Sequence, residues 1–577
     1  MLKRIVSILL ALLILFSLCL TACSTDFDAA DTDDPSSNPS SSDPAVSDDE
    51  DVTSSSQEEE TVSEPTLSPN AETTAKTGFP IVNETVTVTG MMPGDIKWEE
   101  QDVVESLEEL TNIHIDMTVV ETSSFTERKL VSLASDEYPD FFYMAELTTE
   151  QQRLFGQNSK ALVDLLPLIK EGYAPNLSGF FYGDASDPTS TQMAASTLAS
   201  CLVDGALYSL PYIYNGFDEG FIAINTAFLE KLELEVPETT DQLLETLRAV
   251  VKGNPNGNKK SKEIGIASLH GTHYLTPFMG CFGIPTEAIY LDGSTVKLGA
   301  MQPEYKDFLT FFATCFEEKL VDTRLADNVP NDSTVVSELL NNTIFMMYTG
   351  STAVFGDYAE NYDVFTLTTP VNGGEKVWLA PKDVETGTFA ITDKCEYPEA
   401  MLRWADYFYS SEGQLLLNIG VEDKHHTLDG EEFPDATWKP KKKAAATMLE
   451  WLTSFSILPS LNTVTAPGFY LYTPVTCSDD ELAVAQCDFR NELLDYHGGR
   501  YPTVTFTEDE LAGLEGFEAL CSYIDDMQLK FITGDADIEE EWDNYIAILE
   551  KYRVDSFIEI YQSAYDRYQE LIPTPYP

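Results

Sequence analysis

The sequence has few basic residues. There are 34 Lys and Arg against 97 Asp and Glu, and the formal net charge at pH 7 is −63. A surface of this sign repels the phosphates of nucleic acids and the headgroups of anionic lipids. We therefore expect no nucleic-acid partner and no membrane contact through surface charge. The charge mildly favours a neutral or cationic ligand, although a local basic pocket would override that preference.

The residue patterns of several common catalytic and metal sites are also missing. The chain has no CxxC pair, no HExxH helix and no G-x-S-x-G turn. Its histidine clusters are His270 with His273 and His425 with His426, and neither has a recognisable third ligand nearby. Nothing selects a pair of glycosidase carboxylates among so many acids. We therefore expect no enzyme activity and no cofactor.

The N-terminus has the features of a secretory signal. Lys3 and Arg4 precede an almost wholly apolar run over residues 5–20, and the tetrapeptide Leu20-Thr21-Ala22-Cys23 follows. This tetrapeptide resembles a bacterial lipobox, whose cysteine is diacylated and becomes the first mature residue. The resemblance implies a signal peptide over residues 1–22 and a palmitate-bearing lipid anchor at Cys23, on the extracytoplasmic face of the cell membrane. The alternatives are an ordinary signal peptide and an N-terminal anchor helix.

Residues 23–78 differ in composition from the rest of the chain. They are rich in Ser, Thr, Pro, Asp and Glu and contain almost nothing that could be buried. Such a segment cannot offset the entropy cost of ordering, and its like charges extend it. We expect a disordered acidic tether that holds a folded part away from the membrane.

The remaining chain alternates predicted strands and helices. Roughly 500 residues are more than one hydrophobic core usually spans, so two lobes are expected. Strands are predicted at 85–89, 113–121 and 138–144, and helices at 101–111 and 124–134. This alternation predicts an α/β fold with a largely parallel sheet. Helical spacing of apolar residues in the last third predicts a helical C-terminal extension.

Several segments, in this order, resemble a known family. They are VVESLEELTNIHID, YPDFF, Leu210-Pro211-Tyr212, IAINTAFLEKLELEVPETTDQLLETLRAV, IFMMYTGSTAVFGDY and PEAMLRWADYFYSSEG. Behind a lipobox and a tether, this set resembles the extracellular solute-binding proteins of ABC importers, of the maltose-binding-protein type. The resemblance is strongest to the long lipoprotein branch that includes the alginate-oligosaccharide binders.

The resemblance implies a fold and a function. The fold is periplasmic-binding-protein-like, with two α/β lobes joined by a crossing hinge that closes on a ligand. Lobe one is expected at 79–221 plus 345–400, and lobe two at 222–344 plus 401–577. The function implied is that of a monomeric receptor, which captures a carbohydrate, an oligosaccharide above all, and delivers it to ABC permease subunits. Peptides and polyamines are alternative ligands on the same scaffold.

Aromatic and polar side chains near the expected cleft are the candidate ligand contacts. Aromatic rings match the apolar face of a sugar, and carboxylates and amides match its hydroxyls. The candidates are Trp98, Glu99, Tyr212, Tyr214, Phe217, Tyr348 and Trp378. Because 11% of all residues are aromatic, each of these rings is also a candidate for core packing.

The stretch GNPNGNKKSKEIG, residues 253–265, resembles a different kind of site. Its glycines are four positions apart, so a phosphate-binding loop is excluded. Relatives of the alginate-binder branch carry an EF-hand-like calcium loop here. The matching positions are Asn254, Asn256, Asn258, Lys260 and Glu263. Only one of them is a carboxylate, so we expect a vestigial loop that holds no ion.

Two other classes of function remain open. One is a surface polysaccharide-processing hydrolase, and the other is an adhesin or sensor lipoprotein that uses the same fold without transport.

Overall fold

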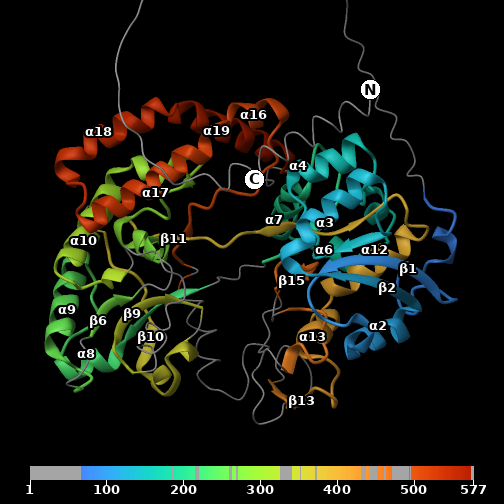
Figure 1. Ribbon diagram of the computed structural model, residues 1–577, viewed down its shortest axis with the longest axis horizontal. Helices are drawn as coiled ribbons and strands as arrows, with labels where there is room; N and C mark the ends of the chain where they lie inside the picture. The colour runs from blue at the N-terminus through green and yellow to red at the C-terminus, as the bar shows by residue number, and fades with distance from the viewer. Residues whose placement is uncertain are drawn as a thin grey trace, which may run out of the picture. The chain divides into compact units, whose positions relative to one another are not determined.

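The computed structural model describes residues 67–572 with gaps (Figure 1). The gaps are 185, 215–219, 259–262, 268–270, 325–340, 351, 371–372, 430–436, 442–450, 460–462, 471–492 and 494. The predicted signal peptide, Cys23 and most of the predicted tether lie outside the described residues. Within the described part, no helix is both long and apolar enough to cross a membrane.

The first lobe contains a six-stranded sheet in the order β15-β4-β12-β3-β1-β2. Its strands are β1 (Val86–Pro93), β2 (Ile113–Val120), β3 (Phe141–Tyr143), β4 (Leu210–Ile213), β12 (Val384–Ile391) and β15 (Gly468–Phe469). β1 pairs in parallel with β2 and β3, whereas β12 runs antiparallel to β3 and β4. The strands predicted near the N-terminus are therefore confirmed as β1, β2 and β3.

Helices cover both faces of this sheet. They are α2 (Asp102–Thr111), α3 (Thr122–Ser135), α6 (Pro175–Tyr182), α7 (Pro188–Cys201), α12 (Pro398–Asp406) and α13 (Ser411–Ile419). Side chains alternate along a strand, so Phe141 and Tyr143 enter the main core with α2 and α12, while Phe142 enters a smaller core with α3. A core on both faces explains the continuous apolar run of β3.

The second lobe contains a four-stranded sheet in the order β10-β5-β9-β6. Its strands are β5 (Phe221–Asn225), β6 (Ile264–Ala267), β9 (Ile344–Thr349) and β10 (Tyr362–Val364). The helices of this lobe are α8 (Thr226–Leu232), α9 (Thr240–Gly253) and α10 (Pro303–Glu317). A hairpin of β7 (Ile289–Asp292) and β8 (Thr295–Leu298) also belongs to it.

The C-terminal extension is helical, as predicted. It consists of α16 (Glu508–Gly513), α17 (Phe517–Thr533), α18 (Ile538–Lys551) and α19 (Val554–Leu571). α17, α18 and the first part of α19 share the core of the second lobe with α10. The end of α19 also touches the first lobe, because Tyr568 Oη is hydrogen-bonded to Ser196 Oγ of α7. Nearby, Thr505 Oγ1 donates to the carbonyl of Leu202 at 2.6 Å.

The expected lobe boundaries differ from the structure in two places. β9 and β10, at residues 344–364, lie in the second sheet, because β9 pairs with both β5 and β6. α12 and α13 lie in the first lobe, where Met401, Leu402 and Trp404 are buried in its main core. The chain therefore returns to the first lobe only after β10.

The expected end of the tether at residue 78 is also too late. Ser68 donates from its backbone N and its Oγ to Glu399 at 2.7 and 2.5 Å. Arg403 donates to the carbonyls of Ala75 and Gly78 at 3.1 and 3.3 Å. Residues 67–78 are thus packed on α12, and their composition hid this because the contacts are polar.

Arg403 and Asp406 form a buried ion pair at this point. Arg403 Nη1 lies 2.9 Å from Asp406 Oδ2, and the two side chains are 3% and 0% exposed. Asp406 also accepts hydrogen bonds from the backbone N–H groups of Asn176 and Leu177, at the start of α6. Burial raises the pKa of Asp406 to about 6, against the lowering effect of these donors and of Arg403.

We expect Asp406→Ala to destabilise the first lobe strongly. The change leaves the Arg403 guanidinium buried without its counter-ion and removes the cap of α6, and loss of one partner of a buried pair costs about 3–5 kcal/mol. Urea unfolding at pH 7 measures the effect. Lys97→Ala is the control, because it breaks the exposed pair with Glu100 and should leave the unfolding midpoint in place. Equal midpoints for Asp406→Ala and the parent protein would contradict the assignment.

Candidate functional site

The chain passes from the first sheet to the second after β4 and returns to the first after β10, and β15 is the last strand of the first sheet. The crossing segments satisfy each other's backbone groups. Tyr214 N donates to the carbonyl of Asp383 at 3.0 Å, and Tyr470 N donates to the carbonyl of Ile213 at 2.7 Å. β11 (Trp378–Leu379) pairs in parallel with β16 (His497–Gly498) beside them. These bonds bring four distant parts of the sequence together.

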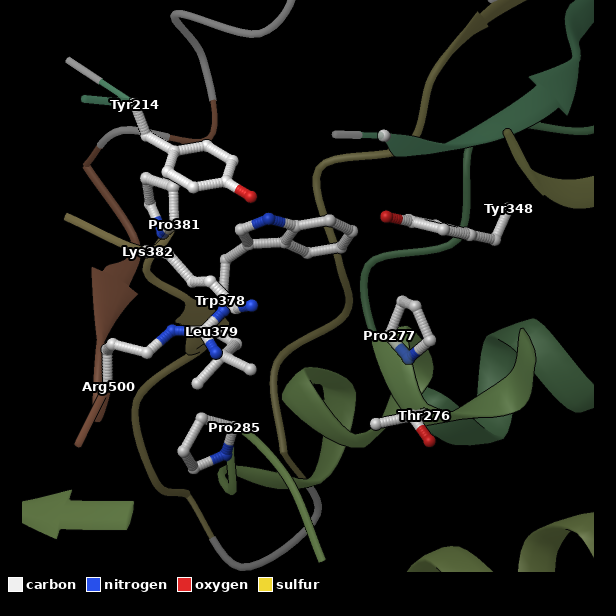
Figure 2. A pocket seen from close by; sticks show the side chains of 11 residues that line it. Tyr214, Thr276, Pro277, Pro285, Tyr348, Trp378, Leu379, Pro381, Lys382 and Arg500 are labelled. Carbon is white, nitrogen blue, oxygen red and sulfur yellow. The ribbon is translucent and has the colours of Figure 1, made fainter. Parts of the chain in front are cut away.

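A cavity of about 240 Å³ lies against these segments (Figure 2). Tyr214 follows the carboxyl end of β4, Gly220 precedes β5, and Tyr348 lies near the carboxyl end of β9. Ligands of open α/β sheets bind at such strand ends. The lining residues are Tyr214, Gly220, Thr276, Pro277, Pro285, Tyr348, Trp378, Leu379, Pro381, Lys382 and Arg500.

Aromatic rings dominate one part of the cavity. The ring centroids of Tyr348 and Trp378 are 6.4 Å apart, and their planes are tilted by 35°. In Figure 2, Tyr348 approaches Trp378 from one side and Tyr214 lies on the other. Tyr348 is only partly buried, whereas Trp378 and Tyr214 are 5% and 2% exposed. A Cβ at Gly220 would lie 2.6 Å from the Tyr348 ring, so only glycine lets this ring pack there.

A second cavity, of about 730 Å³, lies on the reverse side of the crossing segments. Ile213 and Asp383 line this second cavity, whereas their neighbours Tyr214 and Lys382 line the first. Neighbouring side chains of an extended segment point to opposite sides. Arg500 contributes to both cavities. The crossing segments thus form a partition with different side chains on its two sides.

Asp383 is the acidic group of this partition. Its side chain is exposed and lines the second cavity. Partial desolvation by the neighbouring protein raises the pKa of Asp383, and the nearby Arg500 guanidinium opposes the rise only in part. The rest of the second cavity is lined mainly by the flanks of α6, α7 and α19. The first cavity has the strand ends and is the candidate ligand site.

The structure brings together three of the seven candidate ligand contacts, Tyr214, Tyr348 and Trp378. Trp98 is 2% exposed and lies in the main core of the first lobe, so its ring faces cannot reach a ligand. Glu99 is exposed but lines neither cavity. Tyr212 is 2% exposed and packs edge-on against Tyr214. Phe217 lies outside the described residues.

Sequence reasoning missed Lys382 and Arg500. Lys382 follows Trp378 by four residues, and Arg500 follows the glycine pair Gly498-Gly499. Basic residues are scarce in this chain, so a cation beside a candidate aromatic residue was an available signal for Lys382. Arg500 comes from a segment far along the sequence, and no local pattern links it to the cavity.

The loop at residues 253–265 is closed by its own side chains. In the amide orientation that satisfies its neighbours, Asn254 donates to Asn256 Oδ1, Glu263 Oε1 and the Asn258 carbonyl at 3.2, 3.3 and 2.6 Å. Asn258 N donates to Asn256 Oδ1 at 2.8 Å, which forms an Asx turn. Lys260 lies outside the described residues.

These donors do not fit a calcium ion. Calcium takes six to eight oxygen ligands, several of them carboxylates. Glu263 supplies the one carboxylate of the matching positions, and N–H groups of Asn254 and Asn256 already point at it. Across the described residues, no group of three or more His, Cys, Asp and Glu side chains could hold a metal.

The chain also has sequence relatives of known function. The model of the bacterial extracellular solute-binding protein family matches residues 96–415. The fructooligosaccharide ABC transporter substrate-binding protein FusA of Streptococcus pneumoniae is 24% identical over 496 residues. That alignment covers 82% of this chain and 87% of FusA.

Solved structures share the fold. FusA in complex with kestose has a TM-score of 0.66 at 23% identity, over 84% of this chain and 100% of that one. A solute-binding protein from Bifidobacterium longum infantis, described as binding HMO and associated with an ABC transporter, has a TM-score of 0.69 at 18% identity, over 84% of this chain and 99% of that one. The predicted periplasmic-binding-protein-like architecture is thereby confirmed. With a family model that matches more than half of its length, the chain belongs to the bacterial extracellular solute-binding proteins.

Proposed function

We propose that this protein is a membrane-anchored receptor that captures an oligosaccharide between its lobes and delivers it to an ABC permease. The observation that carries the proposal is the cavity in which Tyr214, Tyr348 and Trp378 meet at the crossing segments. Aromatic faces match the apolar faces of sugar rings, and the hydroxyl of Thr276 is a partner for a sugar hydroxyl. No catalytic role is assigned to any residue.

The size of the cavity supports a binding mode in which the cavity encloses one sugar unit and the other units of the oligosaccharide lie outside it. Pockets for drug-sized ligands have volumes of about 300–1,000 Å³, and this one has about 240 Å³. A longer oligosaccharide therefore extends beyond it, between the lobes. The names of the relatives support a carbohydrate ligand, because FusA is described as a fructooligosaccharide-binding protein.

Tyr348→Ala should weaken oligosaccharide binding at least tenfold. The change removes the ring that packs near Trp378 and against Gly220. A tenfold loss of affinity corresponds to about 1.4 kcal/mol of binding free energy. Calorimetric titration with a panel of oligosaccharides measures it. Tyr358→Ala is the matched control, because that ring is 36% exposed and lines neither cavity. Unchanged affinity in Tyr348→Ala would move the ligand site elsewhere.

The loop at residues 253–265 is proposed to be closed without calcium. The melting temperature of the parent protein should then be the same in calcium and in EDTA. Asn254→Asp should lower it in EDTA, because a carboxylate replaces the amide donor beside Glu263 Oε1 and Asn256 Oδ1. Calcium should restore part of the loss in this variant. The exposed residue Asn158 gives the control Asn158→Asp, and a calcium response of the parent protein would overturn the proposal.

The lipid anchor is proposed to sit on Cys23. We expect metabolic labelling with palmitate to mark the parent protein, expressed in a bacterial host, and the protein to fractionate with membranes. Cys23→Ser should lose the label, because serine lacks the thiol that is acylated. Cys521→Ser is the control, since Cys521 is a free thiol of the folded part. A label that persists in Cys23→Ser would place the lipid elsewhere.

A further inference from the structure

The charges on the two sides of the partition differ. Lys382 and Arg500 line the ligand cavity, and no Asp or Glu is found among its described lining residues. The reverse cavity has Arg500 together with Asp187 and Asp383. In a chain with 97 acidic and 34 basic residues, a cavity with two cations and no described carboxylate departs from the overall composition.

We propose that the ligand is an acidic oligosaccharide, with a uronic acid carboxylate placed against Arg500 and Lys382. The inference rests on the proposed function of the same cavity and names the class of sugar that it selects. A ligand of this charge approaches a protein whose whole chain has a formal net charge of −63. Local cations are therefore needed to offset the repulsion from the acidic protein.

The backbone fixes Arg500 at the cavity wall. Gly499 has a φ of +73°, and a Cβ there would lie 2.5 Å from Pro285 Cγ, so the turn before Arg500 requires glycine. The Gly499 carbonyl accepts a hydrogen bond from Leu291 N at 2.9 Å, which ties the turn to the β7–β8 hairpin. Arg500 thus projects from a rigid turn of the second lobe.

The side chain of Arg500 is also oriented. Its Nε donates to the carbonyl of Ala380 at 2.6 Å, which holds the guanidinium plane beside Leu379 (Figure 2). A guanidinium offers its N–H groups in a planar fork that matches the two oxygens of a carboxylate. A preoriented guanidinium loses less side-chain entropy when an anion binds than a freely rotating one.

Lys382 supplies a second, more mobile charge. Its Nζ lies 3.1 Å from Glu385 Oε2, and the two side chains are 52% and 38% exposed. Exposed pairs of this kind contribute little to stability, so a ligand carboxylate can compete for the ammonium group. Asp383 belongs to the same segment but lines the reverse cavity. Lys382 and Arg500 therefore act together on the ligand side of the partition.

The test compares acids with their neutral esters. Homotrimers of galacturonic, glucuronic and mannuronic acid, the methyl esters of each and maltotriose are titrated calorimetrically into the folded protein at pH 7. At least one acid should bind ten times more tightly than its own ester. Methylation removes the charge while the ring and its hydroxyls stay the same, so the ratio isolates the carboxylate.

Variants assign the preference to the two cations. Arg500→Gln and Lys382→Gln should each reduce the ratio of the affinities for acid and ester at least threefold. Arg500→Lys should keep only part of the parent ratio, because an ammonium group lacks the planar pair of N–H groups that a guanidinium offers to a carboxylate. Lys297→Gln is the matched control, since it removes the same charge from a lysine that pairs with Asp292 and lines neither cavity. Its ratio should equal that of the parent protein.

The outcomes separate the inference from the function on which it rests. Binding of maltotriose or an ester as tightly as any acid would overturn the acidic ligand and leave the receptor in place. An acid preference that survives when Arg500→Gln and Lys382→Gln are combined in one variant would overturn the assignment to Arg500 and Lys382. Failure of every carbohydrate to bind would contradict the receptor itself. Equal melting temperatures of the variants without ligand show that the comparison is made on folded protein.

Discussion

The hydrogen bond from Tyr214 N–H to the carbonyl of Asp383 is the contact on which the site depends. Buried backbone groups need partners, and segments that leave one sheet for another lose the partners of that sheet. Here the crossing segments pair with each other, as Tyr470 N also does with the Ile213 carbonyl. The result is an extended partition, in which Ile213 and Asp383 face one cavity while their neighbours Tyr214 and Lys382 face the other. The two sides of the partition therefore carry different side chains.

Local periodicity was enough to predict the elements of the first lobe near the N-terminus. β1, β2, β3, α2 and α3 were predicted because strand and helix periods are local properties. The order of strands across the sheets is not local. β9 follows the segment that was expected to end lobe two, yet it pairs with β5 and β6. The lobe boundaries were misplaced for this reason.

The candidate site was predicted only in part, for a related reason. Aromatic residues at strand ends serve both cores and clefts. Sequence does not distinguish Trp98, which lies in a core and lines neither cavity, from Trp378, which packs in the core of the second lobe and also lines the cavity. Arg500 reaches the cavity only because β16 pairs with β11. That pairing joins segments separated by more than a hundred residues. The two cations of the cavity were thus hidden behind an overall charge of the opposite sign.

The segment that leads into the C-terminal extension carries one of the two cations of the cavity. Arg500 lies in this segment, fixed to the β7–β8 hairpin of the second lobe, while Lys382 belongs to the segment that enters β12 of the first. Further along, Tyr568 and Thr505 contact α7 and the residue that follows it. The spacing of the lobes does not by itself set the distance between the two cations, because β16 pairs with β11 and Arg500 Nε donates to the Ala380 carbonyl. Both cations are therefore held on the paired crossing segments, and a carboxylate bound by both, as proposed, would contact this shared partition instead of one lobe alone.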